Sequence, residues 1–197
     1  MKSEKRAYRE LLLIRHGTVD TDFDTPMSAG ELPAWIDGYN RAPLNEESHP
    51  PAELKERVER CGYLLASSLP RTLESARRLG REPGSREAIF DEAEVARMPV
   101  PWLRMRPWNW LILARVLMTL GYRDRHGVSL RRARERARRG AKRLEYLAGE
   151  HGTVALLGHG AMIWLIAKEL RKRGWEEREA SKENWGVTRL VNIPGEG

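Results

Sequence analysis

Short apolar runs alternate with amphipathic stretches along this chain. Five runs lack polar alternation and predict buried strands, at residues 10–15, 62–68, 87–90, 153–158 and 186–193. Between them, apolar positions at helical spacing predict helices at about 51–60, 71–79, 103–120, 129–148 and 161–173. Strands and helices that alternate in this way are typical of an α/β fold. We therefore expect a mostly parallel sheet that is covered by helices on both faces.

The length of the chain favours one domain. Its 197 residues, of which 41% are hydrophobic, are enough to bury one substantial core and few for two. We expect a single α/β domain over residues 1–197. The segment at about 98–128 has no strand pattern, and we expect it to form a helical cap inserted at the ligand end of the sheet.

Cysteine usage and the N-terminal sequence favour a cytoplasmic protein. The single cysteine, Cys61, excludes an intramolecular disulfide and a metal site built from cysteines. The opening stretch "MKSEKRAYRE" is charged, and the apolar run that follows it is too short for the core of a signal peptide. No uninterrupted apolar run approaches the roughly 20 residues that a membrane-spanning helix needs.

The formal net charge of +7 favours anionic partners without choosing among them. Much of the excess lies between residues 130 and 147, where eight lysines and arginines surround a narrow apolar stripe. We interpret this stretch as a surface helix with its arginines in water, and the alternative is a nucleic-acid footprint. No aromatic residues are interleaved with the arginines for stacking on bases, so no nucleic-acid partner is expected.

Histidines offer the first candidate chemistry. The chain has five, and four of them are followed directly by glycine: His16, His126, His151 and His159. In open α/β sheets, ligands bind outside the carboxyl ends of the strands. His16 and His159 each follow a predicted strand directly, whereas His126 lies in a charged loop and His151 precedes its strand. His49 lies before two prolines in a loop and is expected to be solvated.

Two arginines reach the same end of the predicted sheet. Arg15 precedes His16, and Arg71 falls in the first turn of a helix that follows "ASS". Paired guanidinium groups match phosphate oxygens and disperse the charge of a phosphoryl group in transfer. A neutral imidazole attacks phosphorus when its other nitrogen is held by an acceptor. The second histidine, protonated beside the phosphate, adds positive charge, and the glycines, Gly17 among them, let main-chain amides approach the ligand.

Phosphoryl transfer to or from an alcohol also needs a proton donor, usually a carboxyl group. The stretch "FDEAEV" supplies candidates directly after a predicted strand. If that strand continues through Phe90, alternation along the extended chain places Glu92 best, with Glu94 as the alternative.

Four motifs in this order carry a resemblance to a known family. "LLLIRHGT", "SSLPRTLESA", "FDEAEV" and "ALLGHGAMIWLIA" resemble the histidine phosphatase superfamily, which also contains the cofactor-dependent phosphoglycerate mutases. The resemblance spans the chain from about residue 10 to residue 193 and includes "WIDGYNRAPLNEES".

The resemblance implies a role for each matching residue. His16 is the nucleophile, Glu92 is the proton donor and His159 is the second histidine of the catalytic site. Arg15, Arg71 and His159 form the phosphate pocket, to which Gly17 and Ser67 contribute. No metal or other cofactor is expected, because the arginines and His159 supply the positive charge that a cation would otherwise bring.

Two departures from the family pattern bear on the reaction. "ARMPVPW" replaces the usual acidic-glycine turn and tryptophan after the glutamate, and Val19 with an acidic "DTDFD" run replaces part of the longer signature of mutases. We therefore expect hydrolysis of a small phosphate monoester. The alternatives are a phosphotransferase of mutase type, or a protein that binds nucleic acid or a membrane and has a vestigial site.

The expected cap holds three of the seven tryptophans, Trp102, Trp108 and Trp110. The simpler interpretation is a helix whose apolar residues pack on the rest of the protein. In the alternative, a surface with Trp108, Trp110, Leu111 and Val116 meets the apolar part of a lipid-like phosphate or rests on a membrane.

Overall fold

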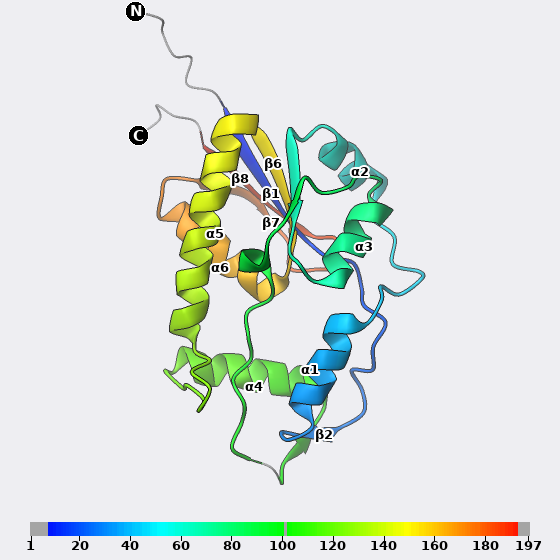
Figure 1. Cartoon of the computed structure of the whole chain (residues 1–197), viewed down its shortest axis with the longest axis vertical. Coiled ribbons are helices and arrows are strands. Elements are labelled where there is room, and N and C mark those ends of the chain that lie inside the picture. Colours follow the sequence, from blue (N-terminus) through cyan, green and yellow to red (C-terminus); the bar gives the residue numbers. More distant parts are fainter. Residues whose placement is uncertain (1–7, 101, 193–197) are drawn as a thin grey trace, which may run out of the picture.

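The computed structural model describes residues 8–100 and 102–192, and it is built on a six-stranded sheet (Figure 1). The strand order is β4-β3-β6-β1-β8-β7. In chain order the strands are β1 (Arg9–Arg15), β3 (Tyr63–Ala66), β4 (Ser85–Arg86), β6 (Thr153–Gly158), β7 (Glu176–Ala180) and β8 (Val187–Asn192). Strands β4, β3, β6 and β1 are parallel, whereas β8 runs antiparallel to β1 and β7 antiparallel to β8. The expected mostly parallel sheet is confirmed.

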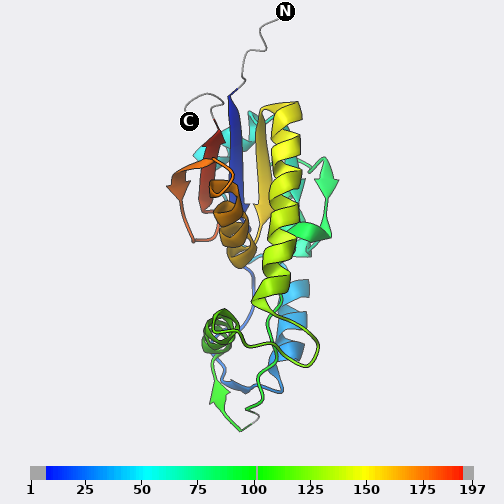
Figure 2. The ribbon, with the colours of Figure 1, turned by 90° about the vertical axis from the view of Figure 1, so that its left-hand side faces the viewer.

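Helices cover both faces of this sheet (Figures 1 and 2). Helices α5 (Leu130–His151) and α6 (Gly160–Arg171) lie on one face, and α2 (Ala52–Glu59) and α3 (Pro70–Arg78) on the other. Successive side chains of β1 point to opposite faces, so Leu11 and Leu13 enter the core under α5 and α6 while Leu12 and Ile14 enter the other core. Both faces are buried, which explains why the strand reads as one continuous apolar run.

The basic stretch forms the surface helix that its pattern predicted. Most of its alanines and leucines, such as Ala137 and Leu144, are buried, and most of its arginines are exposed. Several of these arginines are paired with carboxylates: Arg131 with Glu135, Arg132 with Glu94, Arg138 with Glu169, and Arg143 with Glu87. The basic face is therefore partly compensated by acidic neighbours. The absence of a nucleic-acid partner stays a prediction.

A smaller lobe lies beyond the carboxyl ends of the parallel strands (Figures 1 and 2). It consists of β2 (Met27–Ser28), α1 (Leu32–Arg41), β5 (Arg104–Met105) and α4 (Pro107–Thr119), and β2 pairs with β5. Trp110, Ala114 and Met118 of α4 form its core together with Leu32 of α1. The cap expected at 98–128 is therefore only part of this lobe, because the segment after β1 contributes α1 and β2.

Several element boundaries differ from the prediction. The expected strand at 87–90 is wrong: Ala88–Phe90 forms a turn of 3-10 helix (η1), and only Ser85–Arg86 forms a strand there. Phe90 is fully buried, so this apolar run reflects core packing of a turn rather than an extended segment. The helix expected at 103–120 begins at Pro107 because residues 104 and 105 pair with β2. Ile193 and Pro101, which fall within predicted segments, lie outside the described residues.

Two elements had no clear signal in the sequence. Strand β7 has the sequence EEREA and lies at the sheet edge, where a polar strand meets water on one side. Helix α1 holds Pro33 and Gly38, which are poor helix formers, and buries only Leu32 fully, although Leu32, Trp35, Ile36 and Tyr39 recur at helical spacing. Within the described residues, no helix combines the length and apolar character needed to cross a membrane.

Candidate active site

The two histidines that follow strands meet because β1 and β6 end together. Arg15 at the end of β1 pairs with Gly158 at the end of β6, and the main-chain N–H of His16 donates to the Gly158 carbonyl at 3.1 Å. His16 and His159 are thus the first residues beyond two neighbouring parallel strands. Their ring centroids lie 5.2 Å apart, and their side chains are 2% and 0% exposed.

Arg71 lies between these two rings. Strand β3 pairs with β6 on the side away from β1, so the turn after β3 brings the first residues of α3 beside His159. The Nε atom of Arg71 lies 3.2 Å from Nε2 of His16 and 3.2 Å from Nδ1 of His159. Its Nη1 donates to Oδ1 of Asn40 at 3.0 Å, and its guanidinium lies 4.6 Å from the centre of the Tyr39 ring. Helix α1 of the smaller lobe therefore covers Arg71.

Hydrogen bonding fixes the tautomer of His16. Its Nδ1 lies 2.7 Å from the carbonyl oxygen of Gly17, which can only accept, so Nδ1 carries the proton and Nε2 keeps its lone pair. Burial and, after it, the positive charge of Arg71 lower the pKa of His16 from 6.5 to about 3. The ring is therefore neutral at physiological pH, and the lone pair on its Nε2 accepts a hydrogen bond from Arg71.

His159 is held in the opposite orientation. Its Nδ1 accepts from Arg71, so Nε2 donates to Oγ of Ser67 at 2.7 Å, and that hydroxyl lies 3.0 Å from Oγ1 of Thr72. Burial, followed by the charge of Arg71, holds the pKa of His159 well below its usual value. The protonated state that we expected for this residue is not favoured by these surroundings alone. A phosphate dianion beside the ring would raise the pKa.

Arg15 reaches the same region from the end of β1. Its Nη1 donates to the carbonyl of Lys182 at 2.6 Å. Its Nε is buried, and no described residue accepts a hydrogen bond from it. A side chain added at Gly160, the first residue of α6, would meet that Nε at 3.7 Å. An unsatisfied donor thus lies next to a helix N-terminus, and together these two groups suit an anion.

Glu92 lies near the start of the same helix although no strand leads to it. Its Oε1 accepts from the main-chain N–H of Met162 at 3.3 Å and from that of Ala93 at 2.8 Å. Its negative charge also raises the pKa of Arg71, against the larger lowering by burial. The expected strand does not continue through Phe90, but Glu92 still lies at the start of α6, the helix that follows His159.

Glu94, the alternative proton donor, points elsewhere. Its carboxylate lies 3.8 Å from Nη2 of Arg132 on α5, and its side chain is 47% exposed, against 30% for Glu92. This geometry favours Glu92 over Glu94 as the candidate proton donor.

Two arginines hold the segment that carries these carboxylates. Arg136 of α5 donates through Nη2 to the carbonyls of residues 91 and 92, at 2.8 Å and 2.7 Å. Arg115 of α4 donates to the carbonyls of residues 93 and 94, at 2.5 Å and 3.0 Å. Four consecutive carbonyl groups thus find donors on two helices, one from each lobe. No sequence pattern indicates this role, because both arginines have the spacing of ordinary surface charges.

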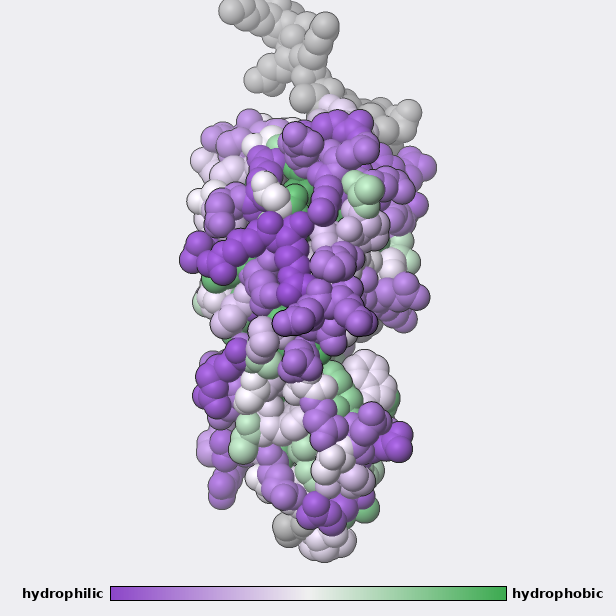
Figure 3. Space-filling view, turned by 90° about the vertical axis from the view of Figure 1, so that its right-hand side faces the viewer, coloured by the Kyte–Doolittle hydropathy of each residue, from purple (hydrophilic) through white to green (hydrophobic). Residues whose placement is uncertain are grey.

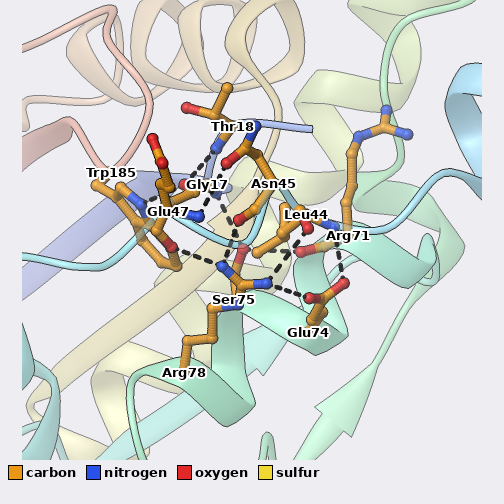
Figure 4. A network of polar contacts seen from close by, with 11 residues as sticks. Gly17, Thr18, Leu44, Asn45, Glu47, Arg71, Glu74, Ser75, Arg78 and Trp185 are labelled. Carbon is orange, nitrogen blue, oxygen red and sulfur yellow. Dashed lines mark hydrogen bonds and ion pairs between the residues drawn. The ribbon is translucent and has the colours of Figure 1, made fainter. Parts of the chain in front are cut away.

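A polar network fixes the loop that follows β1 (Figure 4). The main-chain N–H of Gly17 donates to Oγ of Ser75 on α3 at 3.0 Å. The N–H of Thr18 donates to Oγ of Ser48 at 2.8 Å, and the same oxygen accepts from the indole of Trp185 at 3.0 Å. The residue after the candidate nucleophile is therefore anchored to the helix that carries Arg71.

Arg78 completes this network from the far end of α3 (Figure 4). It donates to the carbonyls of Asn45 and Ser48, at 2.6 Å and 2.8 Å, and to Oε1 of Glu74 at 2.7 Å. The other carboxylate oxygen of Glu74 accepts from the N–H of Leu44 at 2.9 Å. These partners belong to the segment "WIDGYNRAPLNEES", so this motif has a structural role next to the site.

The remaining histidines lie away from this centre, as expected. His126 is exposed in the loop between α4 and α5, where Nε of Arg125 donates to its ring at 3.2 Å. His151 is exposed at the end of α5 and stacks on Tyr63, and His49 is exposed in a loop. Across residues 8–100 and 102–192, no three histidine, cysteine, aspartate or glutamate side chains gather closely enough to hold a metal ion.

Comparisons with known proteins show the family and the fold of this chain. The family model described as "Histidine phosphatase superfamily (branch 1)" matches residues 11–196. A phosphoglycerate mutase from Bacillus anthracis has a similar structure, with a TM-score of 0.62, 15% identity, and coverage of 97% of this chain and 91% of that one. No curated protein matches the sequence closely enough to count as a relative.

Two similar structures are phosphatases by name. The mycobacterial glucosyl-3-phosphoglycerate phosphatase has a TM-score of 0.58 and 16% identity, over 93% of this chain and 90% of that one. A phosphoserine phosphatase from Entamoeba histolytica has a TM-score of 0.57 and 15% identity, over 95% of each chain. At such low identity these structures establish the fold alone.

Proposed function

The chain belongs to the histidine phosphatase superfamily, and from this premise we propose that it hydrolyses small phosphate monoesters through a phosphohistidine on His16. One observation carries the proposal. The imidazole of His16 is neutral, its tautomer is fixed by the Gly17 carbonyl, and its unprotonated Nε2 accepts a hydrogen bond from Nε of Arg71 at 3.2 Å. A nucleophilic nitrogen is thus held beside a cation that attracts phosphate.

In the first step, the lone pair on Nε2 of His16 attacks phosphorus. The N–P bond forms, and the bond between phosphorus and the leaving oxygen breaks with its electron pair on that oxygen. The carboxyl group of Glu92 donates a proton to the leaving oxygen, so an alcohol departs. The phosphorylated ring becomes positively charged, and the Gly17 carbonyl stabilises that charge through its hydrogen bond with Nδ1.

In the second step, water hydrolyses the phosphohistidine. The oxygen of the water bonds to phosphorus while the Glu92 carboxylate accepts a proton from that water. The N–P bond breaks, and its electron pair returns to Nε2 of His16. Inorganic phosphate leaves and the original tautomer is restored.

We propose that Arg15, Arg71 and His159 bind the phosphoryl oxygens. The unsatisfied Nε of Arg15 and the buried guanidinium of Arg71 support this role, because both gain an acceptor when a phosphate enters. Ser67 orients His159, and Gly17 leaves room for the close approach of the loop to Trp185.

Hydrolysis is favoured over a mutase-type transfer by the sequence around the site. The mycobacterial and Entamoeba proteins of similar structure are named as phosphatases, and the Bacillus protein is named as a mutase. This chain lacks the longer signature after the triplet that mutases use, so we assign water as the acceptor.

The test compares two variants that each remove the histidine of an Arg-His-Gly triplet. His16→Ala is expected to lose at least about a thousandfold in kcat/KM on a panel of phosphate monoesters, whereas His126→Ala keeps wild-type activity. The wild type should form an acid-labile, base-stable phosphoprotein that His16→Ala does not form. Full activity in His16→Ala, or loss of activity in His126→Ala, would refute the proposal. Transfer of phosphate to an added alcohol instead of water would identify a phosphotransferase.

A further inference from the structure

Helix α4 presents an apolar ridge to solvent. Trp108, Ile112, Val116 and Leu120 follow one another at intervals of four residues, with exposed fractions of 52%, 48%, 50% and 78%. At a rise of about 1.5 Å per residue the ridge is roughly 18 Å long. Nine large hydrophobic side chains are exposed among the described residues, and six of them lie between Trp102 and Leu120. We call the four residues of α4 and its C-terminal cap the α4 ridge.

The α4 ridge is not needed to build the smaller lobe. The core of that lobe is formed by Trp110, Ala114 and Met118, which lie on the opposite side of the same helix and are buried. Of the surface that the sequence suggested for lipid contact, Trp108 and Val116 are exposed. Trp110 is buried because its indole donates to the carbonyl of Met27 at 2.8 Å.

Arginines lie near both ends of the α4 ridge, and those at its C-terminal end carry charge that no described carboxylate pairs. From residue 97 to residue 125 the sequence holds six arginines and one acidic residue, Asp124, whose side chain is buried. At the start of α4, Arg104 and Arg106 are paired with carboxylates of the smaller lobe, Glu31 and Asp24. Arg123 and Arg125 at the other end are exposed and form no ion pair with any described residue.

The position of α4 leaves this face free. Figure 2 shows α4 at the outer edge of the smaller lobe, at the end of the molecule opposite the termini. Figure 3 shows that the body is mostly hydrophilic, whereas hydrophobic residues lie between charged ones on the smaller lobe. The α4 ridge is therefore part of the exposed surface of the smaller lobe.

We propose that the α4 ridge binds an anionic phospholipid membrane surface, with the ridge in the interfacial layer and the flanking arginines at the lipid phosphates. Aromatic and aliphatic side chains on one helix face, with arginines beside them, are typical of interfacial helices. Anionic lipid complements the excess of arginines, whereas a second copy of the chain in a twofold contact would bring these arginines against each other. This inference is independent of the proposed catalytic function.

The test is co-sedimentation of the full chain with vesicles of phosphatidylglycerol and phosphatidylcholine in equal parts. The wild type should bind these vesicles, bind pure phosphatidylcholine about tenfold or more weakly, and lose binding as salt rises, because screening weakens the contacts of the arginines. Trp108→Ser and Leu120→Ser should each reduce binding to the anionic vesicles, by about tenfold for the tryptophan. Arg123→Gln combined with Arg125→Gln should reduce it further and flatten the salt dependence.

Trp164→Ser is the matched control. Trp164 lies on α6 of the body and is 50% exposed, close to the value for Trp108. This variant should bind vesicles like the wild type, and thermal unfolding should show that all variants are folded. No binding of the wild type, or equal loss in the Trp108 and Trp164 variants, would overturn the proposal. A wild-type dimer that Trp108→Ser converts to a monomer would overturn it too, because a second copy would then cover the α4 ridge.

Discussion

Arg136 donates a hydrogen bond of 2.7 Å to the main-chain carbonyl of Glu92. The segment around Glu92 has no strand partner, so its carbonyls depend on side-chain donors. Arg136 satisfies two of them from α5, and Arg115 satisfies the next two from α4. The backbone that carries the proposed proton donor is therefore positioned by both lobes.

Removing Arg136 should impair catalysis most for poor leaving groups. In Arg136→Gln the shorter side chain cannot reach both carbonyls, so Glu92 loses its fixed position. A displaced acid slows departure of an alkyl alcohol, but it matters little for a nitrophenolate, which leaves without a proton. We expect kcat/KM to fall about tenfold or more for alkyl phosphates and less than about threefold for p-nitrophenyl phosphate.

Arg139→Gln is the control for this change. It also removes an arginine from α5, and it should leave kcat/KM for both substrates unchanged. An equal loss for the two substrates in Arg136→Gln would mean that Arg136 is needed for folding or binding rather than for placing the acid.

The two candidate carboxylates should behave differently when each is neutralised. Glu92→Gln removes the group that lies beside the start of α6, so we expect a loss of about a hundredfold or more on alkyl phosphates. The limb of the pH profile that reports the acid should disappear as well. Glu94→Gln removes only a half-exposed partner of Arg132 and should keep activity within about threefold. The reverse pattern would assign the proton donor to Glu94.

Much of the site could be predicted because its chemistry lies at strand ends. His16, His159 and Ser67 each follow a continuous apolar run, and the rule that parallel strands end at one edge brings them together without knowledge of the loops. Arg71 could be placed as well, because a helix start directly after a strand lies at the same edge.

The rest depends on contacts that local patterns do not encode. Asn40 contacts Arg71 only because α1 folds over the site, and the local sequence of α1 does not indicate where that helix packs. The roles of Arg115 and Arg136 rest on contacts across more than 20 residues of sequence. Glu92 was identified from a strand that does not form, so that prediction named a residue near the site for the wrong structural reason.

Gly17 should not tolerate a side chain. A Cβ at this position would lie 2.5 Å from Cζ2 of Trp185 and 2.8 Å from Oγ of Ser48, and the buried indole has little room to move. We expect Gly17→Ala to lower the free energy of unfolding by about 1–3 kcal/mol and to reduce activity, because the carbonyl that holds His16 shifts with the loop. Urea unfolding and kinetics measure the two effects.

Gly38→Ala provides the comparison. Gly38 lies within α1, and nothing lies within 4 Å of an added Cβ. Alanine is the better helix former, so this change should raise the free energy of unfolding by about 0.5–1 kcal/mol. If both alanine variants were equally stable, steric crowding at Gly17 would not be the reason for its glycine.

The buried neutral His16 should make stability fall with acid. Its pKa is lowered from 6.5 to about 3 on folding, mainly by burial, so between these values the unfolded chain binds a proton that the folded chain does not. The contribution of neutral His16 to the free energy of unfolding is complete above about pH 6.5 and is lost as the pH falls toward 3. Within this window, the free energy of unfolding falls by up to about 1.4 kcal/mol for each unit by which the pH is lowered.

His16→Asn removes this titration while keeping a polar side chain. The free energy of unfolding should therefore fall less between about pH 7 and pH 5 in the variant than in the wild type, by up to about 2 kcal/mol. Urea unfolding at the two pH values measures this difference, whatever the substitution costs at neutral pH. His126→Asn should keep the wild-type dependence, because that side chain is exposed in the folded chain too. An unchanged pH dependence in His16→Asn would show that His16 is not the buried neutral base on which the proposed first step depends.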